Sequence, residues 1–229
     1  PCRKIEEHRP FVLPPAAREE YRVELYLQSR GISLDVIRYC VSRGILYESL
    51  PYHNCVFVGL DRNGIPRYAA LRSTCDGPKA FKGEQAGSDK RHSFCIPPAV
   101  RSRRAAVYEA APDALAHMTL EGGRADKYRL SLGGIYVPQD TSTDRPAKSP
   151  AALEAFLQSH PEVDELELCM DNDRAGRWAA QNIAKHYSKE YTVTVNLPPI
   201  EGYDWADMAK EEKEKRAARS RAVCLDREL

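Results

Sequence analysis

The 229-residue sequence lacks several features that would place it in a specialised class of protein. It has no run of about 18 apolar residues, which a helix needs to cross a membrane, and its opening, PCRKIEEHRP, lacks the apolar core of a signal peptide. Its seven cysteines are odd in number, and no two form a CxxC pair. We therefore expect a cytoplasmic protein with reduced thiols, no membrane contact and no zinc site.

A large net charge is also missing, since the sum is only +1 at neutral pH. The charge is unevenly distributed, however. Residues 62–104 contain ten Lys or Arg and three Asp or Glu, a local charge of +7 that leaves −6 for the rest. A basic segment on a nearly neutral protein is a candidate contact for a polyanion such as nucleic acid. Composition alone supports equally well a scatter of these side chains over a solvated surface.

The first hundred residues combine helical and strand patterns. Residues 1–18 are rich in proline and predict a linker or extended arm. Residues 19–100 predict a small, basic α+β domain, in which a helical hairpin precedes a β-hairpin that turns at Asn63-Gly64. The expected elements are helices at 19–32 and 33–45, two strands within 54–74, a functional or mobile loop at 74–91 and a short strand within 92–98.

Strand and helix patterns alternate in the second half of the chain. Strands are expected within 105–110, 127–137, 164–173 and 191–199, and helices within 112–123, 149–161 and 174–189. This alternation predicts an α/β domain over residues 101–210, with a parallel sheet of about four strands and helices on both faces. Ser149 is the expected N-cap of the second helix. The mixed charges of residues 211–229 predict a solvated helix or a frayed end.

One strand fits this scheme poorly. Glu165 and Glu167 alternate with Leu166 and Leu168, whereas central parallel strands are usually apolar throughout. We therefore expect the lower end of this strand to be exposed.

Acidic residues follow two of the expected strands. Asp171 and Asp173 lie in the segment CMDNDRAGR, and residues i and i+2 of a strand point to the same side. Glu109 ends the first strand of the domain, and functional groups of α/β sheets gather at the carboxyl ends of strands. Neighbouring carboxylates repel one another, and a divalent cation removes that conflict. Oxygen ligands, without histidine or paired cysteine, favour Mg²⁺ or Mn²⁺ over zinc.

Other interpretations of these residues are structural. Asp173 could serve only as the N-cap of the helix that follows. The start DNDRAG also resembles a calcium loop, but Ala175 and Asn182 stand where that loop needs an oxygen ligand and a glutamate. His117 is expected to be a packing or surface residue rather than a ligand. Trp178 is expected to lie in the core or to cover a helix.

Four segments in order resemble the toprim domain, the metal-binding catalytic module of bacterial primases, topoisomerases and some nucleases. They are VYEAAPDAL with Glu109 and Asp113, LSLGG, CMDNDRAGRWAA and GYDWADM, and the resemblance covers roughly residues 104–208. The resemblance implies a Rossmann-like toprim fold in which Glu109, Asp171 and Asp173 bind Mg²⁺ or Mn²⁺ and catalyse, with Asp113 supporting them. It further implies supporting roles for Gly133, Gly134, Gly176, Asp204 and Asp207.

The upstream half resembles a module of unknown function that precedes toprim in primase-like proteins of bacterial mobile elements. The matching segments are YLQSRGISLDVI, VFVGLDRNGIPRYAALRST and FKGEQAGSDKRHSF. The resemblance implies that the basic segment guides single-stranded DNA and nucleotides, and that other replication or transfer proteins are partners. The candidate contacts are Arg72, Lys79, Lys82, Lys90, Arg91 and Arg174.

The chain departs from the toprim pattern at two places. Ala110 stands where the first-motif glutamate is usually followed by glycine, and the glycine turn reads LGG where cellular primases more often have LGT. Neither change removes a charged group. The expected function is metal-dependent nucleotidyl transfer, namely primase-like primer synthesis. A toprim nuclease or strand-nicking enzyme and a non-catalytic module that binds single-stranded nucleic acid are the alternatives.

Overall fold

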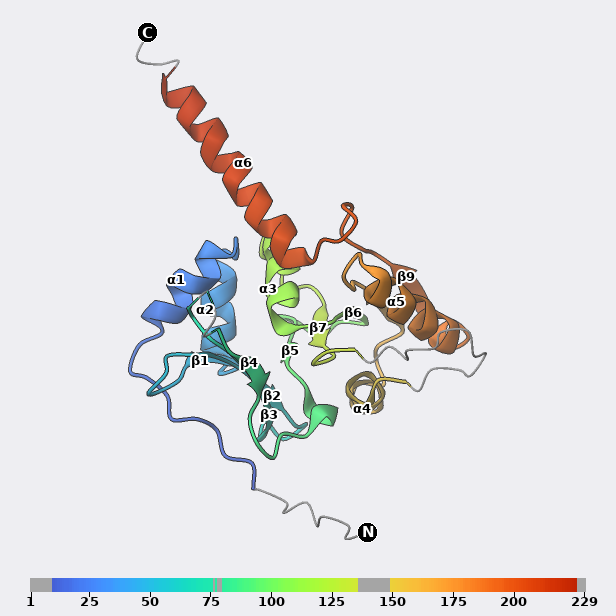
Figure 1. The fold of residues 1–229 in the computed structure, drawn as a ribbon. Helices are drawn as coiled ribbons and strands as arrows, with labels where there is room; N and C mark the ends of the chain where they lie inside the picture. The colour runs from blue at the N-terminus through green and yellow to red at the C-terminus, as the bar shows by residue number, and fades with distance from the viewer. Residues whose placement is uncertain (1–9, 76, 78–79, 136–148, 226–229) are drawn as a thin grey trace, which may run out of the picture.

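A computed structural model of the chain describes residues 10–75, 77, 80–135 and 149–225. Two β-sheets lie in one molecule, and a long C-terminal helix projects from it (Figure 1). Among the described residues, no helix combines the length and the apolar character that crossing a membrane requires.

The first sheet belongs to an α+β module. Helices α1 (Tyr21–Ser29) and α2 (Leu34–Ser42) precede a four-stranded antiparallel sheet in the order β1-β2-β3-β4. Its strands are β1 (Leu46–Glu48), β2 (Cys55–Leu60), β3 (Pro66–Arg72) and β4 (Lys82–Glu84). The predicted hairpin is β2–β3, and Asp61 builds its turn because Oδ1 accepts the Asn63 and Ile65 N–H groups.

Two segments of this module, predicted as a linker and a loop, are more ordered than those predictions. The predicted loop at 74–91 contains the edge strand β4 and a 3-10 turn, η1 (Lys90–His92). The described part of the N-terminal arm, residues 10–18, lies along the sheet. The Ala17 N–H donates to the Glu48 carbonyl at 2.7 Å, and the Tyr47 hydroxyl donates to the Pro14 carbonyl at 2.7 Å. Phe11 of the arm packs on the outer apolar face of the sheet.

The second sheet has five strands in the order β5-β7-β6-β8-β9. They are β5 (Cys95–Ile96), β6 (Arg104–Tyr108), β7 (Tyr128–Ser131), β8 (Glu165–Leu168) and β9 (Thr192–Val195). The strands β7, β6, β8 and β9 are parallel, and β5 is an antiparallel edge strand. The predicted α/β class with about four parallel strands is therefore confirmed. β5 precedes the domain boundary expected at residue 100, yet it pairs with this second sheet.

Helices cover both faces of the second sheet, as predicted (Figure 1). Helices α4 (Ala151–Ser159) and α5 (Arg174–Tyr187) pack on one face, and α3 (Ala111–Leu120) and α6 (Trp205–Leu225) pack on the other. The core on the α3–α6 face also takes in α1 and α2. There Gly31, with a φ of +87°, touches the backbone of Ala209 so closely that an added Cβ would lie 2.3 Å from it. The α+β module and the second sheet therefore share one core.

One expectation about an individual residue is wrong, and one about the exposure of a strand holds only in part. Ser149 is not the N-cap of α4, because Pro150 occupies that position and the Ser149 hydroxyl pairs with the Tyr187 hydroxyl at 2.6 Å. The lower end of β8 is only half exposed. Glu165 faces solvent, but Glu167 turns inward and accepts a hydrogen bond from the buried Lys127. The alternating pattern thus reflects a buried ion pair on one face of the sheet and apolar packing on the other.

Candidate metal centre

Five carboxylates meet at the carboxyl edge of the second sheet. Glu109 follows β6, Asp171 and Asp173 follow β8, Asp113 lies in the first turn of α3, and Asp204 precedes α6. They lie close enough to act on one another: the charges of Glu109, Asp204 and Asp173 raise the pKa of Asp171, and the charges of Asp204, Asp171 and Glu109 raise that of Asp113. Strand ends of an α/β sheet commonly carry functional groups, and here β6 and β8 are followed by acids.

The D-N-D segment is held by backbone contacts. Asp173 is the N-cap of α5, because its Oδ1 accepts the Gly176 N–H at 2.7 Å. Gly176 passes so close that an added Cβ would lie 2.1 Å from the Asp171 carbonyl oxygen. The Asn172 N–H donates to the Tyr203 carbonyl at 2.9 Å, which ties the segment to the loop before Asp204. Helix capping and membership of the acidic cluster therefore coexist at Asp173.

The glycine turn after β7 supports Glu109 from the other side. The Gly134 N–H donates to the Glu109 carbonyl at 2.9 Å. Gly133 has a φ of +67°, and a Cβ there would lie 2.7 Å from the Tyr68 hydroxyl. The Lys90 ammonium donates to the Gly133 carbonyl at 3.1 Å. The turn therefore joins Glu109 to the α+β module, and glycine is needed because that module approaches so closely.

Burial and like charge favour protonated carboxyls in this cluster. Burial, followed by the charges of Glu109, Asp204 and Asp173, raises the pKa of Asp171 to about 7. Burial, with the charges of Asp204 and Asp171, raises the pKa of Asp113 well above its ordinary range. Full ionisation of this group at neutral pH therefore requires a positive charge among the carboxylates.

One lysine of the α+β module acts on the cluster. Burial and the charge of Asp173 raise the pKa of Glu109, and the charge of Lys82 on β4 opposes that rise. The edge of the first sheet thus faces the carboxylates.

The cluster fits a hard divalent cation. Oδ1 of Asp113 and Oδ1 of Asp171 are buried without a hydrogen-bond partner, although buried polar atoms are normally paired. The available donors are carboxylate oxygens, which suit Mg²⁺ or Mn²⁺. An ion bound here would pair the orphaned oxygens and offset the repulsion.

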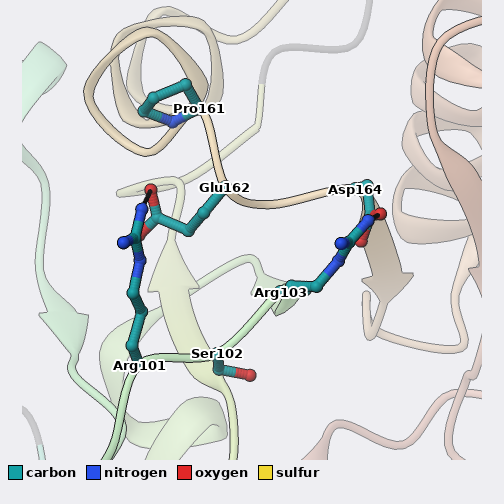
Figure 2. A pocket seen from close by; sticks show the side chains of 6 residues that line it. All are labelled: Arg101, Ser102, Arg103, Pro161, Glu162 and Asp164. Atoms are coloured by element: carbon teal, nitrogen blue, oxygen red, sulfur yellow. Dashed lines mark hydrogen bonds and ion pairs between the residues drawn. The ribbon is translucent and has the colours of Figure 1, made fainter.

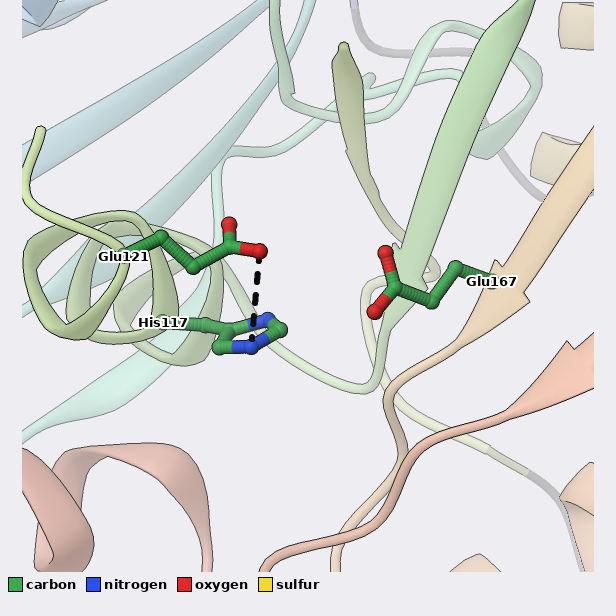
Figure 3. Close-up of side chains that lie close together, drawn as sticks. All are labelled: His117, Glu121 and Glu167. Carbon is green, nitrogen blue, oxygen red and sulfur yellow. Dashed lines mark ion pairs between the residues drawn. The ribbon is translucent and has the colours of Figure 1, made fainter. Parts of the chain in front are cut away.

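A second group of side chains of the kinds that bind metals lies below the carboxylate cluster, on the same face of the second sheet (Figure 3). Ligand atoms of His117, Glu121 and Glu167 lie within 4.8 Å of one another. The Lys127 ammonium already bridges the two glutamates, at 2.7 Å from Glu121 Oε1 and 2.5 Å from Glu167 Oε2, and it is 1% exposed. Arg129, fully buried, donates to Glu121 Oε2 at 2.6 Å. A divalent ion would have to enter beside this buried ammonium, so we interpret the group as an internal ion-pair network.

The surroundings of His117 show that its ring serves packing. Burial lowers the pKa of His117 to about 4, so the ring is neutral. It stacks on Trp205 with ring centres 3.8 Å apart, and it pairs with the Tyr108 hydroxyl at 2.9 Å. His117 is therefore a packing residue, as predicted.

A hollow of about 420 Å³ opens at the opposite edge of the sheet, before β6 and β8 (Figure 2). It is lined by Arg101, Ser102, Arg103, Pro161, Glu162 and Asp164. The two arginines form ion pairs within it, Arg101 with Glu162 and Arg103 with Asp164. Each of its charged side chains therefore has a partner of opposite charge, and the carboxylate cluster is the stronger candidate site.

The predicted nucleic-acid contacts have different surroundings. Lys82 is exposed beside the cluster, and Arg72 is its direct neighbour across the sheet, with its Nε donating to the Tyr26 hydroxyl at 2.8 Å. Arg174 is exposed at the start of α5, directly after Asp173. Lys79 lies outside the described residues.

Two of the predicted contacts are engaged within the protein. Lys90 pairs with Glu84 at 2.9 Å in addition to its bond with Gly133, although half of its side chain remains exposed. Arg91 pairs with Asp89 at 2.6 Å. Lys90 thus holds the interface between the two sheets, and Arg91 orders the turn that carries it.

The D-W-A-D segment, for which a supporting role is predicted, forms the start of helix α6. Asp204 Oδ1 accepts the Asp207 N–H at 2.6 Å, so Asp204 caps α6 and Asp207 lies in its first turn. Trp205 between them was not singled out, and neither was the Lys127–Arg129 network. The signal for the network was present, because charged residues alternate with uncharged ones at position 127, just before β7, and position 129 within it, just as they do on β8.

Comparisons with known families agree with this architecture. Residues 106–209 match the family described as Toprim-like, and residues 25–99 match a family described as a protein of unknown function. The chain therefore carries a toprim-like domain preceded by that module, in the predicted order. No curated protein matches the chain.

Solved structures with the same fold are primase cores. The primase fragment of the bacteriophage T7 primase-helicase protein matches with a TM-score of 0.55 at 15% identity, covering 84% of this chain and 72% of its own. The DnaG catalytic core matches with a TM-score of 0.52 at 18% identity, covering 88% and 72%. The DnaG primase catalytic domain bound to single-stranded DNA matches with a TM-score of 0.50 at 16% identity, covering 88% and 71%. The chain therefore has a primase-like toprim fold.

Proposed function

We propose that this chain is a primase-like nucleotidyltransferase that synthesises a primer on single-stranded DNA with Mg²⁺ or Mn²⁺, in the replication or transfer system of a mobile element. The observation that carries the proposal is the convergence of five carboxylates whose burial and repulsion call for a cation. The primase-like fold of both halves supports it.

Glu109, Asp171 and Asp173 would hold the cation, with Asp113 and Asp204 behind them. When bound, the cation neutralises the charge of a nucleotide triphosphate and of the leaving pyrophosphate. The 3′-hydroxyl oxygen of a primer attacks the α-phosphorus, and the bond to pyrophosphate breaks. Glu109 would take the hydroxyl proton on its carboxylate, a role supported by burial and the charge of Asp173, which raise its pKa above that of an ordinary glutamate.

The basic edge would bind the phosphates of template, primer or nucleotide. Lys82 already lies near enough to influence Glu109, and Arg72 stands beside Lys82. Arg174, exposed directly after Asp173, offers a further positive charge. Binding through such phosphate contacts should weaken steeply as salt rises. The likeness to a DnaG domain bound to single-stranded DNA supports this choice of partner.

Primer synthesis on single-stranded DNA with nucleoside triphosphates and Mn²⁺ or Mg²⁺ tests the proposal. We expect Asp171→Ala and Glu109→Gln to lower the rate by about 100-fold or more, because each removes charge stabilisation from the reacting phosphates. Glu165→Gln is the matched control, since Glu165 is an exposed acid at the other end of the same strand. Synthesis unchanged in both cluster variants would refute the assignment.

Two further assays separate the alternative activities. Cleavage of labelled DNA without nucleotides, abolished by Asp171→Ala, would identify a toprim nuclease instead. DNA binding without any calorimetric signal for Mn²⁺ would identify a non-catalytic binding module.

A further inference from the structure

An aromatic layer lies directly beneath the carboxylate cluster. Its members are the three rings of Tyr108, His117 and Trp205, which are 0%, 4% and 6% exposed. The rings form a chain, because the Tyr108 hydroxyl pairs with His117 Nδ1 and the His117 ring stacks on the Trp205 indole at 3.8 Å and 19°. The near-parallel stack on His117 fixes the plane of the indole.

Three of the chain segments that carry these acids each contribute one ring to this layer. Tyr108 directly precedes Glu109, and Trp205 directly follows Asp204. His117 lies one turn after Asp113 on α3, so the two side chains share a face of that helix. The layer therefore joins three separate chain segments, each at a residue that lies one to four positions from its acid.

Trp205 also reaches the fourth segment. Its indole N–H donates to the Cys169 carbonyl at 3.1 Å, in a fully buried contact. Cys169 lies two residues before Asp171, on the same strand end. The stack of Trp205 on His117 reaches α3, the helix that carries Asp113. One tryptophan thus connects the end of β8, the start of α6 and helix α3.

The layer also separates two sets of charges. Along α3, Asp113, His117 and Glu121 succeed one another at four-residue steps, so they stack as acidic cluster, aromatic layer and ion-pair network. Along β8 the same three layers appear at Asp171, Cys169 and Glu167. Figure 3 shows His117 and Glu121 on one helix opposite Glu167 on its strand. The neutral rings thus lie between the acidic cluster and the buried ion-pair network.

We infer that Trp205 is a positioning residue, which sets the spacing of Asp171, Asp204 and Asp113 for a divalent cation through its bond to the Cys169 carbonyl and its stack on His117. This inference rests on the proposed metal-dependent function. Groups that orient metal ligands without binding the metal themselves typically contribute about 10- to 100-fold to metal affinity. Trp205 is not itself a ligand, because its indole N–H is committed to Cys169.

Calorimetric titration with Mn²⁺, well below the unfolding temperature, tests the inference. Trp205→Phe keeps an aromatic ring but removes the N–H donor, so we expect Mn²⁺ affinity to fall about 10-fold. Trp178→Phe is the matched control, because Trp178 is the only other tryptophan and lies on α5. Tyr108→Phe removes only the hydroxyl next to His117, and we expect it to weaken Mn²⁺ binding by about two- to threefold without disturbing the fold.

Fluorescence supplies a second measurement. In Trp178→Phe the sole tryptophan is Trp205, and its emission should change with Mg²⁺ at the same midpoint as a calorimetric titration of that variant with Mg²⁺. Variants that melt at lower temperature but bind Mn²⁺ as tightly as the parent would show that Trp205 serves packing alone, and would overturn the positioning role. Absence of Mn²⁺ binding by the parent chain itself would overturn the proposed metal centre, and the positioning role with it.

Discussion

The raised pKa of Asp171 predicts that metal binding depends strongly on pH. Burial and the neighbouring carboxylates raise this pKa to about 7, and a carboxyl must lose its proton before it can bind a cation. With one proton displaced, Mn²⁺ affinity should be about 10-fold lower at pH 6 than at pH 8. The proton released per ion should be about 0.9 at pH 6, about 0.5 at pH 7 and about 0.1 at pH 8.

Calorimetry in two buffers with different ionisation enthalpies measures both quantities. Oxygen-free solutions keep Mn²⁺ from oxidising at the higher pH. Because Glu109 and Asp171 influence each other, the measured values belong to the pair. Affinity that differs by less than about twofold between pH 6 and pH 8, with no proton release, would refute the argument from burial. A complete lack of binding would refute the metal centre itself.

The same pKa determines how stability responds to pH. Between about pH 4 and pH 7 the folded Asp171 keeps a proton that the unfolded chain has lost, so the free energy of unfolding of the metal-free protein falls as pH rises through this window. A bound cation removes that penalty. Mg²⁺ should therefore raise the melting temperature more at pH 8 than at pH 5.5, which differential scanning calorimetry can measure.

Two substitutions away from the carboxylates test the packing, each by equilibrium unfolding in urea. Lys127→Met leaves Glu167 without its buried partner and should cost about 3–5 kcal/mol, whereas adding Glu167→Leu should recover part of the loss; a cost under about 1 kcal/mol would contradict the network. Gly31→Ala should cost about 2 kcal/mol or more, because its Cβ would lie 2.3 Å from Ala209, whereas Gly44→Ala, also at positive φ but in open space, should cost only about 1 kcal/mol. Equal costs for the two glycines would contradict the close helix contact.

The parts of the fold that sequence reasoning found are those with strong local periodicity. The alternation of strands and helices after residue 104 predicted the parallel sheet, because each element carries its own apolar pattern. The D-x-D spacing at the end of β8 predicted that Asp171 and Asp173 would lie near Glu109, since parallel strands end at one edge. These inferences needed no knowledge of distant contacts.

The features that were missed depend on pairing between distant segments. Strand β4 reads Lys-Gly-Glu and has no apolar pattern, so only its register with β3 makes it a strand. The inward turn of Glu167 depends on Lys127, 40 residues away. A charge on a strand predicts exposure when considered alone, and it predicts a buried pair only when its partner strand is known.

The core shared by α1, α2, α3 and α6 has a consequence for how this protein can be divided. The two sequence families meet between residues 99 and 106, and a cut there would look natural from their boundaries. It would nevertheless expose the apolar faces of α3 and α6 to water and remove Lys90 from the glycine turn that supports Glu109. The toprim-like half expressed alone should therefore be poorly soluble, because the boundary between the families is not a boundary between folding units.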